Sequence, residues 1–235
     1  MISLCCPSRG RPEFAKRLVD TANNNSKYTT EFLFYINDDD PKLEEYKDLL
    51  DEKYYTIGPN QSTGYSWNQM ANRANNDIIM LVGDDVQVLT DHWDDKIKQQ
   101  YDKFNDKILM VVPSDGRSKG NKNFGDDIKL WPDESLPSGH FALHKNWIKA
   151  LGYFVPPFFW HFYLDTYTQK VSRKINRCLF LPTVTFKAKK IFDNTHEQVI
   201  SHLNIAERDR WIWNKVRDRH LNADVDTLRS FIESF

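Results

Sequence analysis

Two adjacent carboxylates, Asp84 and Asp85, follow an unbroken apolar run at residues 78–82. Such a run is typical of a parallel strand that is covered on both faces. Open α/β sheets bind ligands outside the carboxyl ends of their strands, which is where this pair would lie. Neighbouring carboxylates repel each other unless a cation neutralises them. The pair therefore predicts a hard divalent ion, Mn²⁺ or Mg²⁺, held together with phosphate oxygens.

Helix capping is the competing interpretation of the acidic residues. It suits at least one residue of the cluster 38–40, which follows an expected strand at 31–37 and precedes a short polar helix at 42–51. It suits Asp84 and Asp85 less well, because residues 86–89 continue an extended pattern. Thr90 and Asp91 are better placed to cap the helix that is expected from His92.

The elements that must position these acids alternate between strand and helix along the first half of the chain. Strands are expected at 2–6, 31–37, 54–57, 78–82 and 108–112, and helices at 12–25, 42–51, around 67–74 and at 92–104. This alternation predicts an α/β fold with a mainly parallel sheet.

The second half of the chain has a different pattern. A long polar loop is expected at 114–135, an aromatic band that mostly forms core at 141–162, a helix at 164–175 and an extended segment at 178–186. From about residue 194 the chain is expected to be helical, with Trp211 and Trp213 as docking groups. We therefore expect one catalytic domain at 1–192 and a helical C-terminal extension at 193–235 packed on it.

Composition narrows the class of protein. The 235 residues carry a formal net charge of -1 and are 40% hydrophobic, which argues against disorder and against a whole-chain basic field for nucleic acid. No apolar run is long enough to span a bilayer. The three cysteines lack a CxxC spacing, so buried thiols in a reducing cytoplasm are expected.

Three motifs in order resemble the GT-A glycosyltransferases, especially the family 2-like group often met in bacteriophage genomes. They are PSRGRP after the first strand, DDD after the second, and SWNQMANRANNDIIMLVGDDVQV. The resemblance covers roughly residues 1–180. It implies a GT-A (Rossmann-like) fold and a nucleotide-diphosphate sugar donor, most simply a UDP-sugar.

The resemblance also implies roles for particular residues on the donor side. The first loop would wrap the nucleotide, the acid after the second strand would contact the base or ribose, and the helix before the fourth strand would approach the donor. The first loop contains Pro7, Ser8, Arg9 and Arg11. The acid after the second strand is Asp38, and the helix before the fourth strand contributes Trp67 and Asn68.

The family's Asp-x-Asp metal motif is incomplete here, because Val82 occupies its first position. We expect Asp85 to bind the metal, and Asp84 to contact the metal or the donor sugar and ribose. Many relatives supply a late His just after the strand at 182–186, where this chain has none. His196 is the nearest substitute.

On the acceptor side, Gly152, Tyr153 and Phe154 match a Gly-x-Phe pattern, and Leu164-Asp165 stands where relatives have Glu-Asp. Asp165 is therefore the candidate general base, which would make the transfer inverting. The alternative for Asp165 is an acid at a helix N-terminus, favoured by the macrodipole. If its side chain points away from the site, a retaining route stays open.

Taken together, the sequence predicts a metal-dependent glycosyltransferase that acts in the cytoplasm, the host's if the protein is viral, on a glycan or other hydroxyl acceptor. Two alternatives remain open: a sugar nucleotidyltransferase, although its Gly-rich first loop is reduced here to Gly10, and a non-catalytic carbohydrate- or nucleotide-binding module. A nucleic-acid acceptor is not favoured, because the basic stretch 208–219 is interleaved with acids such as Asp209 and is expected to be a solvated helix.

Overall fold

The computed structural model describes residues 1–116, 129–130, 139–188 and 204–235, and one sheet runs through them in the order β3-β2-β1-β4-β8-β6-β9-β5. A further strand, β7, pairs with β9. The strands are β1 (Ile2–Ser8), β2 (Glu31–Asn37), β3 (Tyr55–Gly58), β4 (Ile78–Leu81), β5 (Val86–Val88), β6 (Met110–Ser114), β7 (Lys129–Leu130), β8 (Phe141–His144) and β9 (Cys178–Ala188).

The first four strands are parallel, as the sequence predicts, because β1 pairs in parallel with β2 and β4, and β2 with β3. Their carboxyl ends therefore meet at one edge of the sheet, which we call the carboxyl edge. Strand β8 runs antiparallel to β4, with Leu81 opposite Phe141, so β8 starts at the same edge. Strand β9 pairs with β6 along its earlier part and with β5 at its C-terminal end.

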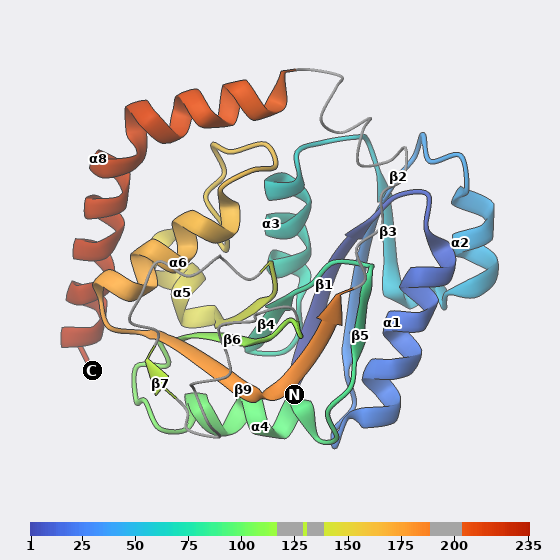
Figure 1. Cartoon of the computed structure of the whole chain (residues 1–235), viewed down its shortest axis with the longest axis horizontal. Coiled ribbons are helices and arrows are strands. Elements are labelled where there is room, and N and C mark those ends of the chain that lie inside the picture. The colour runs from blue at the N-terminus through green and yellow to red at the C-terminus, as the bar shows by residue number, and fades with distance from the viewer. Residues whose placement is uncertain (117–128, 131–138, 189–203) are drawn as a thin grey trace.

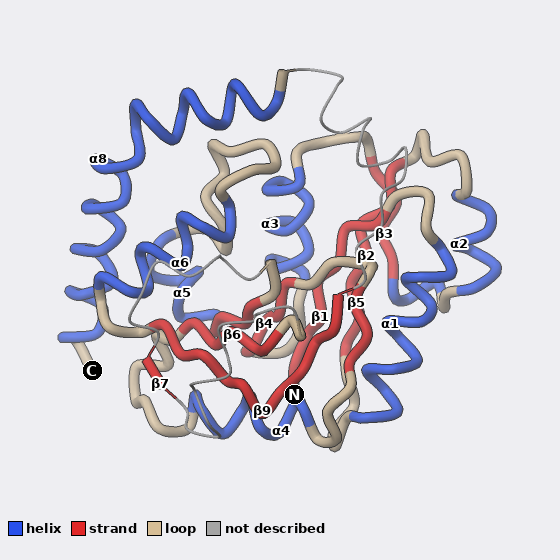
Figure 2. The backbone as a smooth tube through the Cα atoms, in the orientation of Figure 1, coloured by secondary structure: helices blue, strands red, loops and turns tan. Residues whose placement is uncertain are grey.

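Helices cover both faces of this sheet (Figures 1 and 2). On one face lie α1 (Pro12–Asn25), α2 (Leu43–Leu49) and α4 (Trp93–Tyr101), and on the other lie α3 (Thr63–Arg73), α5 (Lys145–Leu151), α6 (Leu164–Lys174) and α8 (Ile205–Glu233). A short 3₁₀ helix, Glu52–Tyr54, precedes β3. Successive side chains of β1 alternate between the two cores: Cys6 packs in the first and Cys5 in the second.

Helix α3 begins at the carboxyl edge, shortly after β3 ends at Gly58. Its N-cap is Ser62, whose hydroxyl accepts a hydrogen bond from the Tyr65 N–H at 3.0 Å. Met70, Ala71 and the following Ala74 are buried against the sheet, as their spacing predicts. The cap and the buried face thereby fix α3 against β1 and β2.

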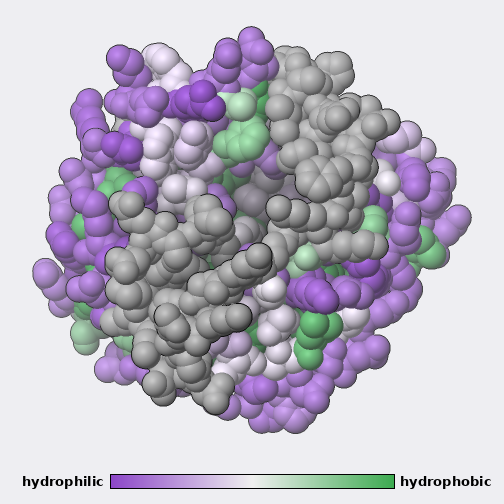
Figure 3. Space-filling model, viewed as in Figure 1, coloured by the Kyte–Doolittle hydropathy of each residue, from purple (hydrophilic) through white to green (hydrophobic). Residues whose placement is uncertain are grey.

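Several details differ from the sequence predictions. Residues 141–151 form β8 and α5, two elements that the aromatic pattern does not reveal. Trp213 is buried in the second core, as expected of a docking group, but Trp211 is 61% exposed. Figure 3 shows hydrophilic residues predominating over α8 and α2, at two sides of the molecule.

Three further expectations concern the domain boundary and the polar loop, the cysteines, and membrane-spanning segments. The boundary at 192/193 and most of the loop at 114–135 lie outside the described residues. The three cysteines are buried and free, matching the predicted buried thiols. No described helix has the length and apolar character needed to cross a membrane.

Candidate functional site

Asp84 is buried at the carboxyl edge, and both of its carboxylate oxygens have protein partners. Oδ2 accepts a hydrogen bond from Ser8 Oγ at 2.7 Å, and Oδ1 lies 3.2 Å from Nη1 of Arg11. An arginine of the first loop is therefore one cation beside Asp84. The expectation that a metal binds at the two acids stays a prediction. Burial nevertheless raises the pKa of Asp84 to about 6, and Arg11 and Ser8 oppose that rise only in part.

The hydroxyl of Tyr46 joins this group into a directed chain of hydrogen bonds. It accepts from the Arg11 backbone N–H at 2.9 Å and lies 2.6 Å from Ser8 Oγ. Because Ser8 donates to Asp84, Tyr46 donates to Ser8, so each hydroxyl both accepts and donates. Such chains polarise one another and end here on a charge, which strengthens every member. Asp84 thus shapes the loop at residues 8–11.

The raised pKa of Asp84 predicts an unusual pH dependence of stability for the ligand-free protein. An acid whose folded pKa exceeds its unfolded value of about 4 keeps its proton longer in the folded state, so stability falls as pH rises from about 4 to about 6. A shift of about two units corresponds to up to about 3 kcal/mol. We expect Asp84→Asn to remove this part of the slope.

Urea unfolding at pH 4.5 and pH 6.5 gives the change in the free energy of unfolding with pH. The effect is the difference in that change between Asp84→Asn and the unsubstituted protein. Other carboxylates titrate in both proteins and cancel in that difference. Asp91→Asn, a substitution of an exposed acid on the same connection, serves as the control and should keep the original slope. Equal slopes in the Asp84 variant and the unsubstituted protein would refute the assignment.

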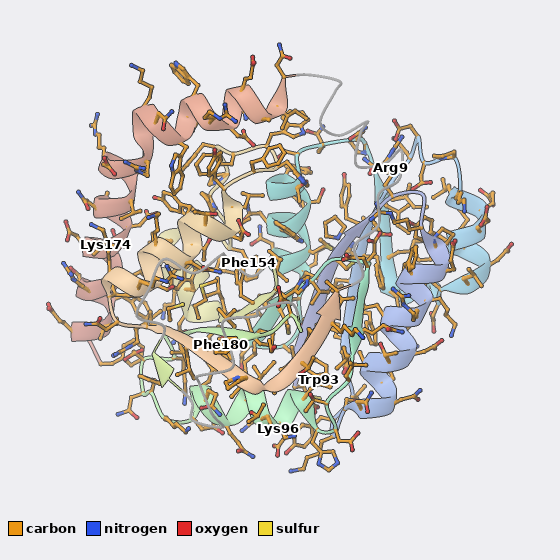
Figure 4. All side chains as sticks on the ribbon, viewed as in Figure 1. Arg9, Trp93, Lys96, Phe154, Lys174 and Phe180 are labelled. Carbon is orange, nitrogen blue, oxygen red and sulfur yellow. The ribbon has the colours of Figure 1, made fainter. Side chains whose placement is uncertain are left out.

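The other residues of the first loop and of the strand ends lie around Asp84. Arg9 forms an ion pair with Asp39, and Figure 4 shows Arg9 near the ends of β1 and β2. Asp40 is buried and accepts hydrogen bonds from the backbone N–H groups of Gly10 and Lys42, both at 2.8 Å, so it ties the first loop to the turn ahead of α2. It does not cap α2, whose N-cap is Lys42.

Asp38 and Pro7 occupy the neighbouring strand ends. Asp38 is exposed where β2 ends, and its backbone N–H donates to Gly58 at 2.8 Å. Pro7 is half-buried in β1, opposite Tyr35 of β2. The predicted donor-side residues of the first two strands are therefore gathered at one edge, with Asp38 on the solvent side and Ser8 on the inside.

Asp85 is half-buried and lies beside Gly83 and His140. A Cβ added to Gly83 would come 2.8 Å from Asp85 Oδ1 and 3.8 Å from His140 Cε1, so a side chain here would collide with the carboxylate. His140 is a residue that sequence reasoning missed. The signal lay in the short strand that it precedes, because an antiparallel neighbour of β4 must begin next to Asp85.

These residues fit a divalent cation only in part. Asp84 is a poor direct ligand because Ser8 and Arg11 engage its two oxygens, whereas Asp85 and the adjacent His140 offer one oxygen and one nitrogen. No cluster of three or more His, Cys, Asp or Glu side chains occurs among the described residues. That suits an ion of the Mg²⁺ type, which takes one or two carboxylates and fills its shell with substrate phosphates and water. His196 lies outside the described residues.

Asn68 braces the acceptor-side segment to α3. Its Nδ2 donates to the carbonyls of Gly64 and Val155, at 2.8 and 2.9 Å, and its Oδ1 accepts from the N–H groups of Phe154 and Val155, at 2.8 and 3.2 Å. These four hydrogen bonds use the whole capacity of the amide, so Asn68 braces this segment. Its expected approach to the nucleotide sugar stays a prediction. Figure 4 places Phe154 between α3 and α6.

Trp67 lies one residue before this brace and is half-buried against the second core. Its indole Nε1 is buried without a hydrogen-bond partner among the described residues. A buried N–H group without a protein partner usually donates to a ligand or a water molecule. The expected approach of Trp67 to the donor stays a prediction.

Asp165 is half-buried in the first turn of α6. Leu164 beside it packs on α3, where its Cδ2 lies 3.1 Å from the position that a Cβ at Gly64 would take. Asp165 therefore directly follows a residue that packs against the first turn of α3. Burial raises the pKa of Asp165, against the hydrogen bond that its Oδ1 accepts from the Thr166 N–H at 2.7 Å. A raised pKa suits a carboxylate that takes up a proton.

Comparison with models of protein families gives no match, and neither does comparison with curated protein sequences. Solved structures do match. The 1–349 fragment of TarS from S. aureus, in complex with UDP-GlcNAc, superposes with a TM-score of 0.64 at 13% identity, over 100% of this chain and 73% of that one. Mannosyltransferase PcManGT from Pyrobaculum calidifontis, in complex with GDP-Man and Mn²⁺, gives 0.62 at 11% identity, over 97% and 74%.

The same fragment of TarS in complex with UDP superposes with a TM-score of 0.60 at 12% identity, over 95% of this chain and 69% of that one. At such identities the likeness establishes the fold and nothing finer. The chain has the α/β GT-A fold that the motif order predicts, with a mainly parallel sheet between helices.

Proposed function

We propose that this protein is a glycosyltransferase that moves a sugar from a nucleoside-diphosphate donor, a UDP-sugar in the first instance, to a hydroxyl acceptor. The observation that supports the proposal is the GT-A sheet, in which Asp85 follows β4 at the carboxyl edge. Asp165, in the first turn of α6, is the acid that we propose for the acceptor side. Similar folds hold UDP-GlcNAc in one case and GDP-Man with Mn²⁺ in another, which supports the class of donor. Membership of the family 2-like, bacteriophage-type group and action in the cytoplasm belong to the same proposal.

The roles of the chain's own residues follow from their positions. The loop at residues 8–11, shaped by Asp84, faces the diphosphate, and Asp38 faces the base or ribose. Asp165 accepts the proton of the acceptor hydroxyl while that oxygen bonds to the anomeric carbon. The bond from that carbon to the diphosphate breaks, and inversion results. Asp85, with His140 beside it, would hold a divalent cation, Mn²⁺ or Mg²⁺, which neutralises the charge of the leaving diphosphate when bound.

Incubation with UDP-GlcNAc or GDP-Man, each with Mn²⁺, tests the proposal. We expect release of UDP or GDP, by transfer to an added acceptor or slowly to water, and loss of that release when EDTA removes the ion. Calorimetry with UDP and Mn²⁺ runs in parallel. Nucleotide binding without turnover would favour a non-catalytic binding module. Pyrophosphate formation from a nucleoside triphosphate would favour a nucleotidyltransferase.

A further inference from the structure

A buried carboxylate of α8 holds the chain just ahead of Asp165. Asp209 is 0% exposed, and its two oxygens accept hydrogen bonds from three consecutive backbone N–H groups. The donors are Trp160, at 3.0 and 3.1 Å, His161, at 2.8 Å, and Phe162, at 2.9 Å. The expectation of a solvated helix at 208–219 is therefore wrong at Asp209, because its charge is stabilised by these donors and by Arg208 Nη1 at 2.8 Å.

Two more side chains on the same helix grip the same segment. Trp213, one turn beyond Asp209, stacks on Tyr163 with 4.8 Å between ring centroids and 16° between planes. Arg208 Nη2 also reaches the carbonyl of Phe158 at 3.3 Å. From the opposite side, Thr63 of α3 hydrogen-bonds His161 Nδ1 at 2.7 Å. The segment 158–163 is thus clamped between α8 and α3.

The clamp acts on a backbone that would not choose this shape unaided. Tyr163 has φ 67°, in the left-handed region, which is unfavourable for a residue with a side chain. This conformation turns the chain into α6, whose second residue is Asp165. Strained residues of this kind persist only where their surroundings hold them. The direction in which Asp165 enters the site therefore depends on contacts made by α8.

We infer that Asp209 is a positioning residue: through the N–H groups of residues 160–162 it sets the placement of Asp165 for proton transfer. The inference rests on the proposed role of Asp165 as the general base. Through Asp209, the helical extension contributes to the acceptor side of the site. The donor side, built from β1, β2 and β4, does not depend on that extension.

Replacing Asp209 by Asn tests the inference. An amide supplies one acceptor oxygen in place of two and turns an N–H group toward the backbone donors, leaving at least one of them unsatisfied. Since misplacement of a reacting group by about 1 Å costs up to about 10²-fold, we expect kcat to fall about 10- to 100-fold. The KM for the nucleotide sugar and the affinity for UDP with Mn²⁺ should change less than twofold.

The substrate is UDP-GlcNAc or GDP-Man, whichever the unsubstituted protein turns over. Hydrogen exchange provides a readout that needs no activity: the amides of residues 160–162 should exchange faster in the variant, and those of β1 and β4 should not. Asp218→Asn is the matched control, because Asp218 lies on the same helix with its side chain 79% exposed, and it should behave as the original protein.

Unchanged kcat in Asp209→Asn would overturn the inference, and so would a loss of UDP affinity in proportion to kcat, which would mean general damage to the fold. Should this variant fail to fold, Arg208→Met removes the partly exposed ion pair to Asp209 and the hydrogen bond to the Phe158 carbonyl, and is expected to lower kcat severalfold at constant KM. Unchanged kcat there would equally count against the clamp. Failure of the proposed function itself is recognised separately, because the original protein would then release no nucleoside diphosphate.

Discussion

Replacing Asp165 by Asn is expected to lower the rate of sugar transfer by roughly 10²–10⁴-fold, the usual contribution of a positioned general base. Asn keeps the shape of the side chain and can still accept from the Thr166 N–H. It also removes a charge whose burial is unfavourable, so the melting temperature should be unchanged or higher. Initial rates of nucleoside-diphosphate release with and without acceptor, together with UDP affinity by calorimetry, measure the effect.

Affinity for UDP should survive this substitution, because the nucleotide site that we propose is built from the loop after β1 and the end of β2. Asp226→Asn, on the exposed face of α8, controls for the general effect of removing an acid, and it should keep full activity. Transfer at the original rate by the Asp165 variant would remove the inverting mechanism proposed above and leave a retaining route.

The same carboxylate sets a pH dependence with a definite sign. A base works only when deprotonated, so kcat/KM should rise with pH through the pKa of Asp165. Burial places that pKa above the usual value of about 3.9, so the acidic limb of the profile should lie higher in pH than for a solvent-exposed aspartate. The residual activity of Asp165→Asn should lack this limb.

Replacing Asp85 by Ala is expected to lower kcat by about 10²–10³-fold, the range typical when one electrostatic stabiliser of a developing charge is removed. The affinity for Mn²⁺ in the presence of UDP should fall as well. Manganese paramagnetic broadening or calorimetry detects this loss without any turnover. The fold should tolerate the change, because Asp85 is only half-buried at a strand end.

Asp91→Ala on the same connection provides the control for Asp85, with an exposed acid removed a few residues away. Its Mn²⁺ affinity and rate should match those of the unsubstituted protein. An Asp85 variant with undiminished Mn²⁺ affinity would move the cation elsewhere. An intact rate as well would refute the proposed role of this acid.

The order of elements could be predicted from local patterns because each strand in the first half is a buried run bounded by breakers. Residues 31–37 were delimited by the acid cluster at 38–40, and the helix 12–25 by Pro12 and the asparagines at its end. Strand β8 and helix α5 were not predicted, because the chain passes directly from the strand into the helix at His144. No turn residue separates them, and dense aromatics obscure the change of period.

The sequence indicated that acids follow particular strands, but it did not indicate the partners of those acids. The positions of Asp84 and Asp85 followed from one buried strand. The pairing of Asp84 with Arg11 spans 73 positions of sequence, and the clamp on Trp160 by Asp209 spans 49. Such contacts depend on how the sheet and its helices pack, which no local period encodes. The burial of Asp209, in a charged stretch of α8, has the same origin.

The hydrogen-bonded chain from Arg11 through Tyr46 and Ser8 to Asp84 has a thermodynamic consequence for ligand capture. Ordering a loop residue costs roughly 1–2 kcal/mol of conformational entropy, and here that cost is met when the protein folds. A nucleotide that arrives at residues 8–11 meets a surface whose shape already exists. Its affinity therefore depends on contacts alone, with little ordering of this loop to offset them.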